Sequence, residues 1–236
     1  MSGNHGAAHL AELLLAECDD RARRRSERRI KAAGFPREKS LRTFDFAANP
    51  NIDPATITTL SKSEWVKKGQ PLCLIGDSGT GKSHLLIALG TAAAEQGYRV
   101  RYTLATRLVN ELVEVADEKQ LTKTIDRYGR VDLLVIDELG YMELDRRGAE
   151  LLFQVIASCY ERRSVAITTN LEFRQWNTVI NDNRLTAALI DRLVHHGHVL
   201  AFTGESYRLR HALSQLNGAG LNDDNASDRQ ALQFDH

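Results

Sequence analysis

The chain has 236 residues, 42% of them hydrophobic, which is enough for one α/β domain with a small extension. No apolar run approaches the roughly 18 residues of a membrane-spanning helix, and Met1 to Leu10 lacks a basic start followed by an apolar stretch, so we expect a cytoplasmic protein. The formal net charge is zero, and the three cysteines form no Cys-x-x-Cys pair, which argues against a zinc site built on cysteine pairs.

The N-terminal segment is predicted to be a helix with a basic second half. Leu10, Leu13, Leu14 and Cys18 recur at helical spacing, so we expect that end to be packed. Gly34-Phe35-Pro36 should end the helix. From Arg21 to Arg42 there are ten Lys or Arg against two acids, which often marks a nucleic-acid contact. By charge alone, a solvated helix face or an acidic protein partner remains equally open.

The middle of the chain alternates strands and helices. Pro54 is expected in the first turn of a helix that runs to about Lys67. A mostly parallel five-stranded sheet with helices on both faces is the fold class that this alternation predicts. The expected strands are Leu72–Ile75, Arg99–Thr103, Val131–Ile136, Val165–Thr169 and His198–Phe202, and the expected helices are Lys82–Glu95, Thr106–Val115, Gly148–Tyr160 and Thr186–His195.

A glycine-rich loop follows the first strand and matches G-x-x-x-x-G-K-[ST] in full. Its backbone amides and the next helix's N-terminus can bind phosphate oxygens. Lys82 adds a charge on the β and γ phosphates, and the Ser83 hydroxyl can coordinate Mg²⁺. The sequence therefore predicts an ATP site with Mg²⁺, built on Gly76-Asp77-Ser78-Gly79-Thr80-Gly81-Lys82-Ser83.

Acidic and amide side chains follow two later strands. Asp137 ends an apolar strand and can hold the magnesium shell, while Glu138 can polarise an attacking water. Asn170 ends the next strand and can orient that water, although by itself it is better explained as a turn-forming residue. These positions predict hydrolysis as well as binding.

Arg192, just before the last strand, is the candidate for an arginine that reaches the γ-phosphate of a neighbouring subunit. The alternative for Arg192 is an ion pair with Asp191 in its own chain. Arg184 competes for the same role.

Together these motifs resemble the AAA+ class and, within it, the IstB family, the helper ATPases of bacterial insertion-sequence transposition. The likeness covers roughly Leu10 to Ala212. It is sharpest where the phosphate loop runs on to His84-Leu85, and in Asp137-Glu138-Leu139-Gly140-Tyr141, Thr168-Thr169-Asn170-Leu171, Asp191-Arg192-Leu193-Val194-His195-His196-Gly197 and Glu205-Ser206-Tyr207-Arg208.

The resemblance implies a protein that binds ATP between subunits of a homo-oligomer, assembles on duplex DNA and presents it to a partner transposase. It implies catalytic roles for Glu138, Asn170 and Arg192, magnesium ligands at Ser83 and Asp137, nucleotide contacts that include His84, and a second sensor at Arg208. A truncated lid is expected, because about thirty residues follow Thr203. The implied division is a basic helical region at 1–48, an ATPase core at 49–213 and a disordered tail at 214–236.

The basic helix is the expected duplex contact, largely without sequence preference. Its candidate residues are Arg21, Arg23, Arg24, Arg25, Arg28, Arg29 and Lys31. Two alternatives remain open: a helicase loader that acts on single strands, similar to DnaC, and a nucleotide-gated binding module without turnover. The intact Glu138 argues against the latter.

Overall fold

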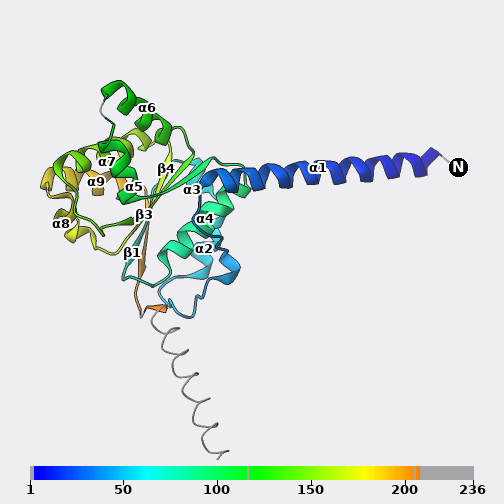
Figure 1. The fold of residues 1–236 in the computed structure, drawn as a ribbon. Helices are drawn as coiled ribbons and strands as arrows, with labels where there is room; N and C mark the ends of the chain where they lie inside the picture. The colour runs from blue at the N-terminus through cyan, green and yellow to red at the C-terminus, as the bar shows by residue number, and fades with distance from the viewer. Residues whose placement is uncertain (1–2, 116, 205, 208–236) are drawn as a thin grey trace, which may run out of the picture.

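The computed structural model describes residues 3–115, 117–204 and 206–207. Its centre is a five-stranded sheet in which every pairing is parallel, in the order β2-β3-β4-β1-β5 (Figure 1). The expected strands and their parallel arrangement are confirmed, with ends that shift by up to three residues. The strands are β1 Leu72–Gly76, β2 Val100–Leu104, β3 Leu133–Leu139, β4 Ser164–Thr169 and β5 His198–Phe202.

Helices cover both faces of the sheet, because side chains alternate along each strand. In β1, Leu72 and Leu74 face one hydrophobic cluster, while Cys73 and Ile75 face the other. The helices are α1 Gly3–Ala33, α2 Pro54–Ser61, α3 Glu64–Lys67, α4 Lys82–Glu95, α5 Ala105–Val113, α6 Glu118–Gly129, α7 Arg146–Cys159, α8 Asn177–Ile180 and α9 Asn183–Val194, with short 3-10 turns at Leu41–Thr43 and Phe173–Gln175. The end of α1 and helices α2 to α4 cover one face; α5 to α9 cover the other.

Two local features differ from the expectation. The single helix expected from Pro54 to Lys67 is broken, because Ser63 adopts a left-handed conformation (φ 58°) between α2 and α3. That break allows Trp65 to turn inward and donate its ring N–H to the Leu60 carbonyl at 2.9 Å. Helix α6 was not expected; it lies against the α5–α7 side through Leu121, Ile125 and Tyr128.

Helix α1 projects from the body of the molecule (Figure 1), and within the described ranges its contacts with α4 and β2 lie near its C-terminal end. The expectation that its first half is packed was wrong, since Leu13, Leu14 and Leu15 are 56%, 59% and 65% exposed. Packing occurs instead at Ala33 and Ile30, which lie against α4 and β2. Helical spacing identified a leucine face, but spacing carries no information on which element covers it.

Within the part of the chain that the structure describes, no helix is long and apolar enough to cross a bilayer. The expected second sensor, Arg208, and the expected disordered tail, 214–236, lie outside the described residues, as does the end of the expected lid. The division at residue 48 remains a prediction.

Candidate nucleotide-binding site

The phosphate loop connects β1 to α4 and depends on glycines with positive φ. Gly79 and Gly81 have φ of 82° and 98°, which lets the loop curl before Lys82 begins the helix. At Gly76 (φ 143°), a Cβ would lie 2.0 Å from the Phe202 carbonyl oxygen of β5. The loop therefore fits closely against the neighbouring strand, and the N-terminus of α4 points its amides into the space above it.

The Lys82 ammonium lies over this loop. It donates hydrogen bonds of 2.6 Å to the carbonyl oxygens of Gly76 and Asp77, and the residue is 7% exposed. Thr80 closes the turn by donating to the Asp77 carbonyl at 2.8 Å. The positive charge of Lys82 is thus held over the phosphate loop, where a phosphate chain can contact it.

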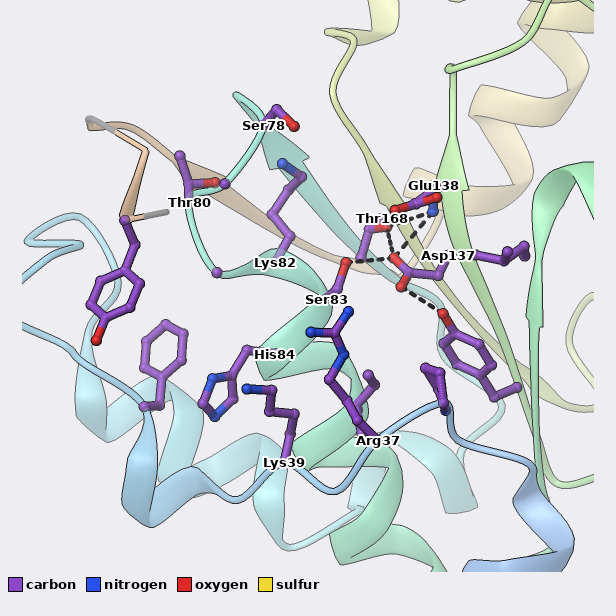
Figure 2. A pocket seen from close by; sticks show the side chains of 18 of the residues that line it. Arg37, Lys39, Ser78, Thr80, Lys82, Ser83, His84, Asp137, Glu138 and Thr168 are labelled. Carbon is purple, nitrogen blue, oxygen red and sulfur yellow. Dashed lines mark hydrogen bonds between the residues drawn. The ribbon is translucent and has the colours of Figure 1, made fainter. Parts of the chain in front are cut away.

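Asp137, at the end of β3, accepts hydrogen bonds from three elements. Its Oδ1 accepts from the Ser83 hydroxyl at 2.9 Å and from Thr168, and its Oδ2 accepts from the Tyr102 hydroxyl at 2.9 Å. Figure 2 shows Ser83, Asp137 and Thr168 converging at one end of the cleft. A hydroxyl and a carboxylate at this separation form the hard oxygen set that Mg²⁺ prefers.

Glu138 is turned away from the sheet by an irregularity in β3. The β3–β4 register shifts between Ile136 and Leu139, and Glu138 has φ 64°, a value uncommon for a side chain with a Cβ. Its amide donates to Thr168 Oγ1 at 2.9 Å, which holds this backbone in place. The carboxylate is consequently exposed at the cleft beside Asp137.

These groups open into a cleft of about 750 Å³. One wall is the phosphate loop, and another is the segment that follows α1, including Phe44, whose ring lies edge-on to His84 at 5.5 Å. His84 also pairs through Nε2 with the Ser40 carbonyl oxygen at 2.9 Å. Asn49 lines the same wall and is 5% exposed.

Two candidate catalytic residues lie outside this cleft. Asn170 follows β4, but its Oδ1 is buried next to Gly140. Arg192 lies on α9, where its guanidinium stacks 4.6 Å from the centre of the Phe153 ring and donates to the Ala188 carbonyl at 2.9 Å. The expected alternative, a pair between Arg192 and Asp191, is not among the ion pairs of the described residues. Arg184 is exposed on the same helix.

The candidate DNA-binding residues of α1 differ in their surroundings. Arg21 pairs with Glu17, and both Arg23 and Arg24 pair with Asp20, on the helix surface. Arg29 instead donates to the Ala94 carbonyl at 2.8 Å, at the C-terminal end of α4. Arg29 therefore fastens α1 to the body of the protein. The remaining exposed candidates are Arg25, Arg28 and Lys31.

Several other cleft residues carry no signal of their role in the sequence. Burial and the neighbouring Asp137 raise the pKa of Tyr102, so its hydroxyl remains a proton donor to that carboxylate. Arg37, Lys39 and Arg107 also line the cleft. Arg37 and Lys39 continue the charge run of the basic helix, and nothing in the sequence pattern separates them from it.

A phosphate loop at the start of a helix, an acid pair on a neighbouring strand and a parallel sheet of this order define a P-loop ATPase of the AAA+ type. Two solved structures share the fold: AMPPCP-bound DnaA from Aquifex aeolicus (TM-score 0.56, 22% identity, 76% of this chain and 55% of that chain) and the DnaC helicase loader (TM-score 0.51, 21% identity, 63% and 87%). At these identities the likeness concerns the fold alone.

Sequence comparison identifies the family to which the chain belongs. Residues 3–215 match the family of IstB-like ATP binding proteins, and the chain belongs to that family. A putative insertion sequence ATP-binding protein of Sinorhizobium fredii is 39% identical over 215 residues, which are 91% of this chain and 72% of that protein. The family resemblance that the motifs indicated is thereby confirmed.

Proposed function

We propose that this protein is an Mg²⁺-dependent ATPase that assembles on duplex DNA and delivers it to a partner transposase. The observation that carries the proposal is the convergence of Ser83, Asp137 and Glu138 on one cleft beside the phosphate loop. Relatives named as insertion sequence ATP-binding proteins support the transposition setting.

The binding part of the mechanism uses the phosphate loop and α4. Loop amides and Lys82 bind the phosphates, and Lys82 exchanges its carbonyl partners for phosphate oxygens. Ser83 and Asp137 would hold Mg²⁺, since both offer oxygen ligands and already lie 2.9 Å apart. When bound, the ion neutralises charge that develops on the phosphates.

The hydrolytic part uses residues at the ends of β3 and β4. Glu138, exposed at the cleft, accepts the proton of the attacking water. Asn170 would orient that water after its side chain turns from its buried place beside Gly140 toward the cleft. Arg192 lies outside its own chain's cleft, so we propose that it acts on the ATP of a neighbouring subunit. This assignment makes hydrolysis depend on the homo-oligomer.

Changing Glu138 to Gln tests the catalytic role, because it removes the proton acceptor and retains the size of the side chain. We expect hydrolysis to fall by about 10²–10⁴-fold while ATP affinity changes little. Exposed Glu143 provides the matched control, and Glu143→Gln should behave as wild type. Unchanged turnover in the Glu138 variant would remove this residue from the mechanism.

Subunit mixing tests the role of Arg192. Arg192→Ala should bind ATP and fail to hydrolyse it, and Lys82→Ala should fail to bind. A mixture restores part of the activity if one protein supplies the arginine and the other supplies the intact cleft. No recovery in mixed oligomers would contradict action across the subunit boundary.

For DNA, we propose that the region 1–48 supplies the duplex contact and residues 49–213 the ATPase core. Helix α1 projects from the body of the protein (Figure 1), and its arginines before Arg29 are exposed, so a phosphate backbone can approach them. Each phosphate contact should contribute about −0.9 to the slope of log affinity against log salt. Arg25→Gln with Arg28→Gln should therefore lower the slope by about 2, whereas exposed Arg162→Gln on the body should leave it unchanged.

Binding to duplex and to single-stranded DNA, each with and without ATP and Mg²⁺, separates the leading proposal from its alternative. Tight, salt-sensitive binding to duplex that depends on ATP supports the transposition helper. Preference for single strands would favour a helicase loader, the function named for one protein of the same fold.

A further inference from the structure

The segment between α1 and the first 3-10 turn, residues 34–40, forms part of the cleft wall. Gly34, Arg37 and Lys39 all line the cleft, on the side that faces the phosphate loop. Figure 2 shows the Arg37 guanidinium directed toward the Ser83 and Asp137 end, and Lys39 close to His84. Two cations from an element outside the phosphate loop therefore face the space that a nucleotide would occupy.

Neither cation has a fixed acidic partner among the described residues. Salt bridges hold Arg21, Arg23 and Arg24 on the outer part of α1, but none of the ion pairs or hydrogen bonds within the described ranges uses the side chain of Arg37 or Lys39. Tyr102, which donates its hydroxyl to Asp137, lines the same cleft as Arg37. The Arg37 side chain therefore faces the space onto which the acid pair opens.

We propose that Arg37 and Lys39 bind the phosphates of the nucleotide from the side opposite the phosphate loop, with Arg37 on the terminal phosphate of ATP. This inference rests on the proposed ATPase function of the cleft. A planar guanidinium can bind two phosphate oxygens at once, and Lys39 acts as a point charge nearer the α4 N-terminus. ADP lacks the group that Arg37 binds, so Arg37 distinguishes ATP from ADP.

The position of these residues in the chain gives the contact a consequence for α1. Arg37 lies only four residues after Ala33, the last residue of the helix, and Gly34 between them has φ 75° with no atom within 4 Å of a Cβ built on it. The Cβ side of Gly34 therefore faces open space, while Ala33 before it and Phe35 after it pack on the body of the protein. A phosphate held at Arg37 fixes the segment from which the arginine-rich helix emerges, so the nucleotide regulates the DNA-contacting element.

The test compares ADP with a non-hydrolysable ATP analogue, AMPPCP, by calorimetric titration in the presence of Mg²⁺. We expect Arg37→Gln to weaken AMPPCP binding by about ten- to a hundredfold, as for loss of a hydrogen bond between charged groups, and ADP binding by less than about threefold. Arg42→Gln is the matched control, since Arg42 is exposed on the next turn and does not line the cleft. An equal loss for both nucleotides, or no loss, would overturn the proposal.

A further variant, Lys82→Ala, and a DNA titration distinguish failure of this contact from failure of the ATP site. If Lys82→Ala and wild type bind nucleotide equally, the proposed ATP site itself fails; if only Arg37→Gln equals wild type, this inference alone fails. Binding of duplex DNA without nucleotide should be unchanged in Arg37→Gln. A loss there would mean that Arg37 serves the phosphates of DNA rather than those of ATP.

A fluorophore on Cys18 tests the link to α1. Cys18 is exposed on this helix, whereas Cys73 and Cys159 are buried, so a thiol reagent should label the helix selectively. In wild type, AMPPCP and ADP should give different anisotropies of the label, and in Arg37→Gln the difference should disappear. Identical anisotropies in wild type would refute the coupling to α1.

Discussion

Replacing Tyr102 with Phe should weaken the protein's response to magnesium without weakening its affinity for nucleotide. Asp137 Oδ1 accepts three hydrogen bonds among the described residues, from Ser83, Thr168 and the Glu138 amide. Oδ2 accepts from Tyr102 alone in the same part of the chain, at 2.9 Å. A hydrogen bond to a charged group contributes about 1.5–3 kcal/mol, and the partial exposure of Tyr102 favours the lower end. That value corresponds to roughly tenfold in an equilibrium constant.

Magnesium titrations of ATP hydrolysis and direct Mn²⁺ binding measure the effect. We expect the half-saturating metal concentration to rise roughly tenfold in Tyr102→Phe, while ATP affinity in EDTA and the melting temperature stay close to wild type. Tyr98→Phe is the control, because Tyr98 is also partly buried on this side of the sheet but lies outside the cleft. If Tyr102→Phe shows wild-type metal dependence, the phenol does not position Asp137.

Three other outcomes follow from the packing. Arg29→Ala should release the end of α1 and speed its proteolysis, at a cost of about 1–2 kcal/mol in stability, whereas Arg28→Ala should do neither. Gly76→Ala should lower the free energy of unfolding in urea by more than about 2 kcal/mol, because its Cβ would meet the Phe202 carbonyl at 2.0 Å. Burial raises the pKa of Cys73 to about 12 from its ordinary value near 9, so the unfolded chain loses this proton at lower pH than the folded protein. The free energy of unfolding should therefore fall by about 1.4 kcal/mol per pH unit between those two pKa values. Cys73→Ala should remove that part of the dependence of stability on pH.

The local parts of the site could be predicted from the sequence. Short motifs determine the conformation of the phosphate loop, with its glycines at 76, 79 and 81, and the position of the acid pair at 137 and 138. Positive φ values and strand ends depend mainly on residues that are neighbours in the chain. The strands were predictable for a similar reason: most of them are short, mainly apolar runs between turn residues, whereas β2 alternates Val100, Tyr102 and Leu104 with polar residues. Helix α6 was missed because its apolar positions, such as Leu121 and Ile125, are sparse among charged residues.

The long-range parts could not be predicted. Tyr102 meets Asp137 only because β2 pairs with β3, a strand order that periodicity does not encode. In the sequence, Arg37 and Arg29 are two members of the same basic run. The fold places Arg37 at the cleft, whereas Arg29 donates a hydrogen bond to the C-terminal end of α4. The prediction that the first half of α1 is packed was wrong, because the spacing of its leucines indicates an apolar face but not which element covers that face.

The one-sided attachment of α1 makes it a mechanical lever. Helix α1 has 31 residues, and the part that precedes its attachment at Arg29 is roughly 39 Å long, so each 10° of bending at that attachment would move the far end by about 7 Å. A small adjustment of the backbone beside a phosphate would then appear, at the tip, as a step comparable to the spacing of two base pairs. A small backbone change at the attached end of the helix would therefore become a large displacement of its free end.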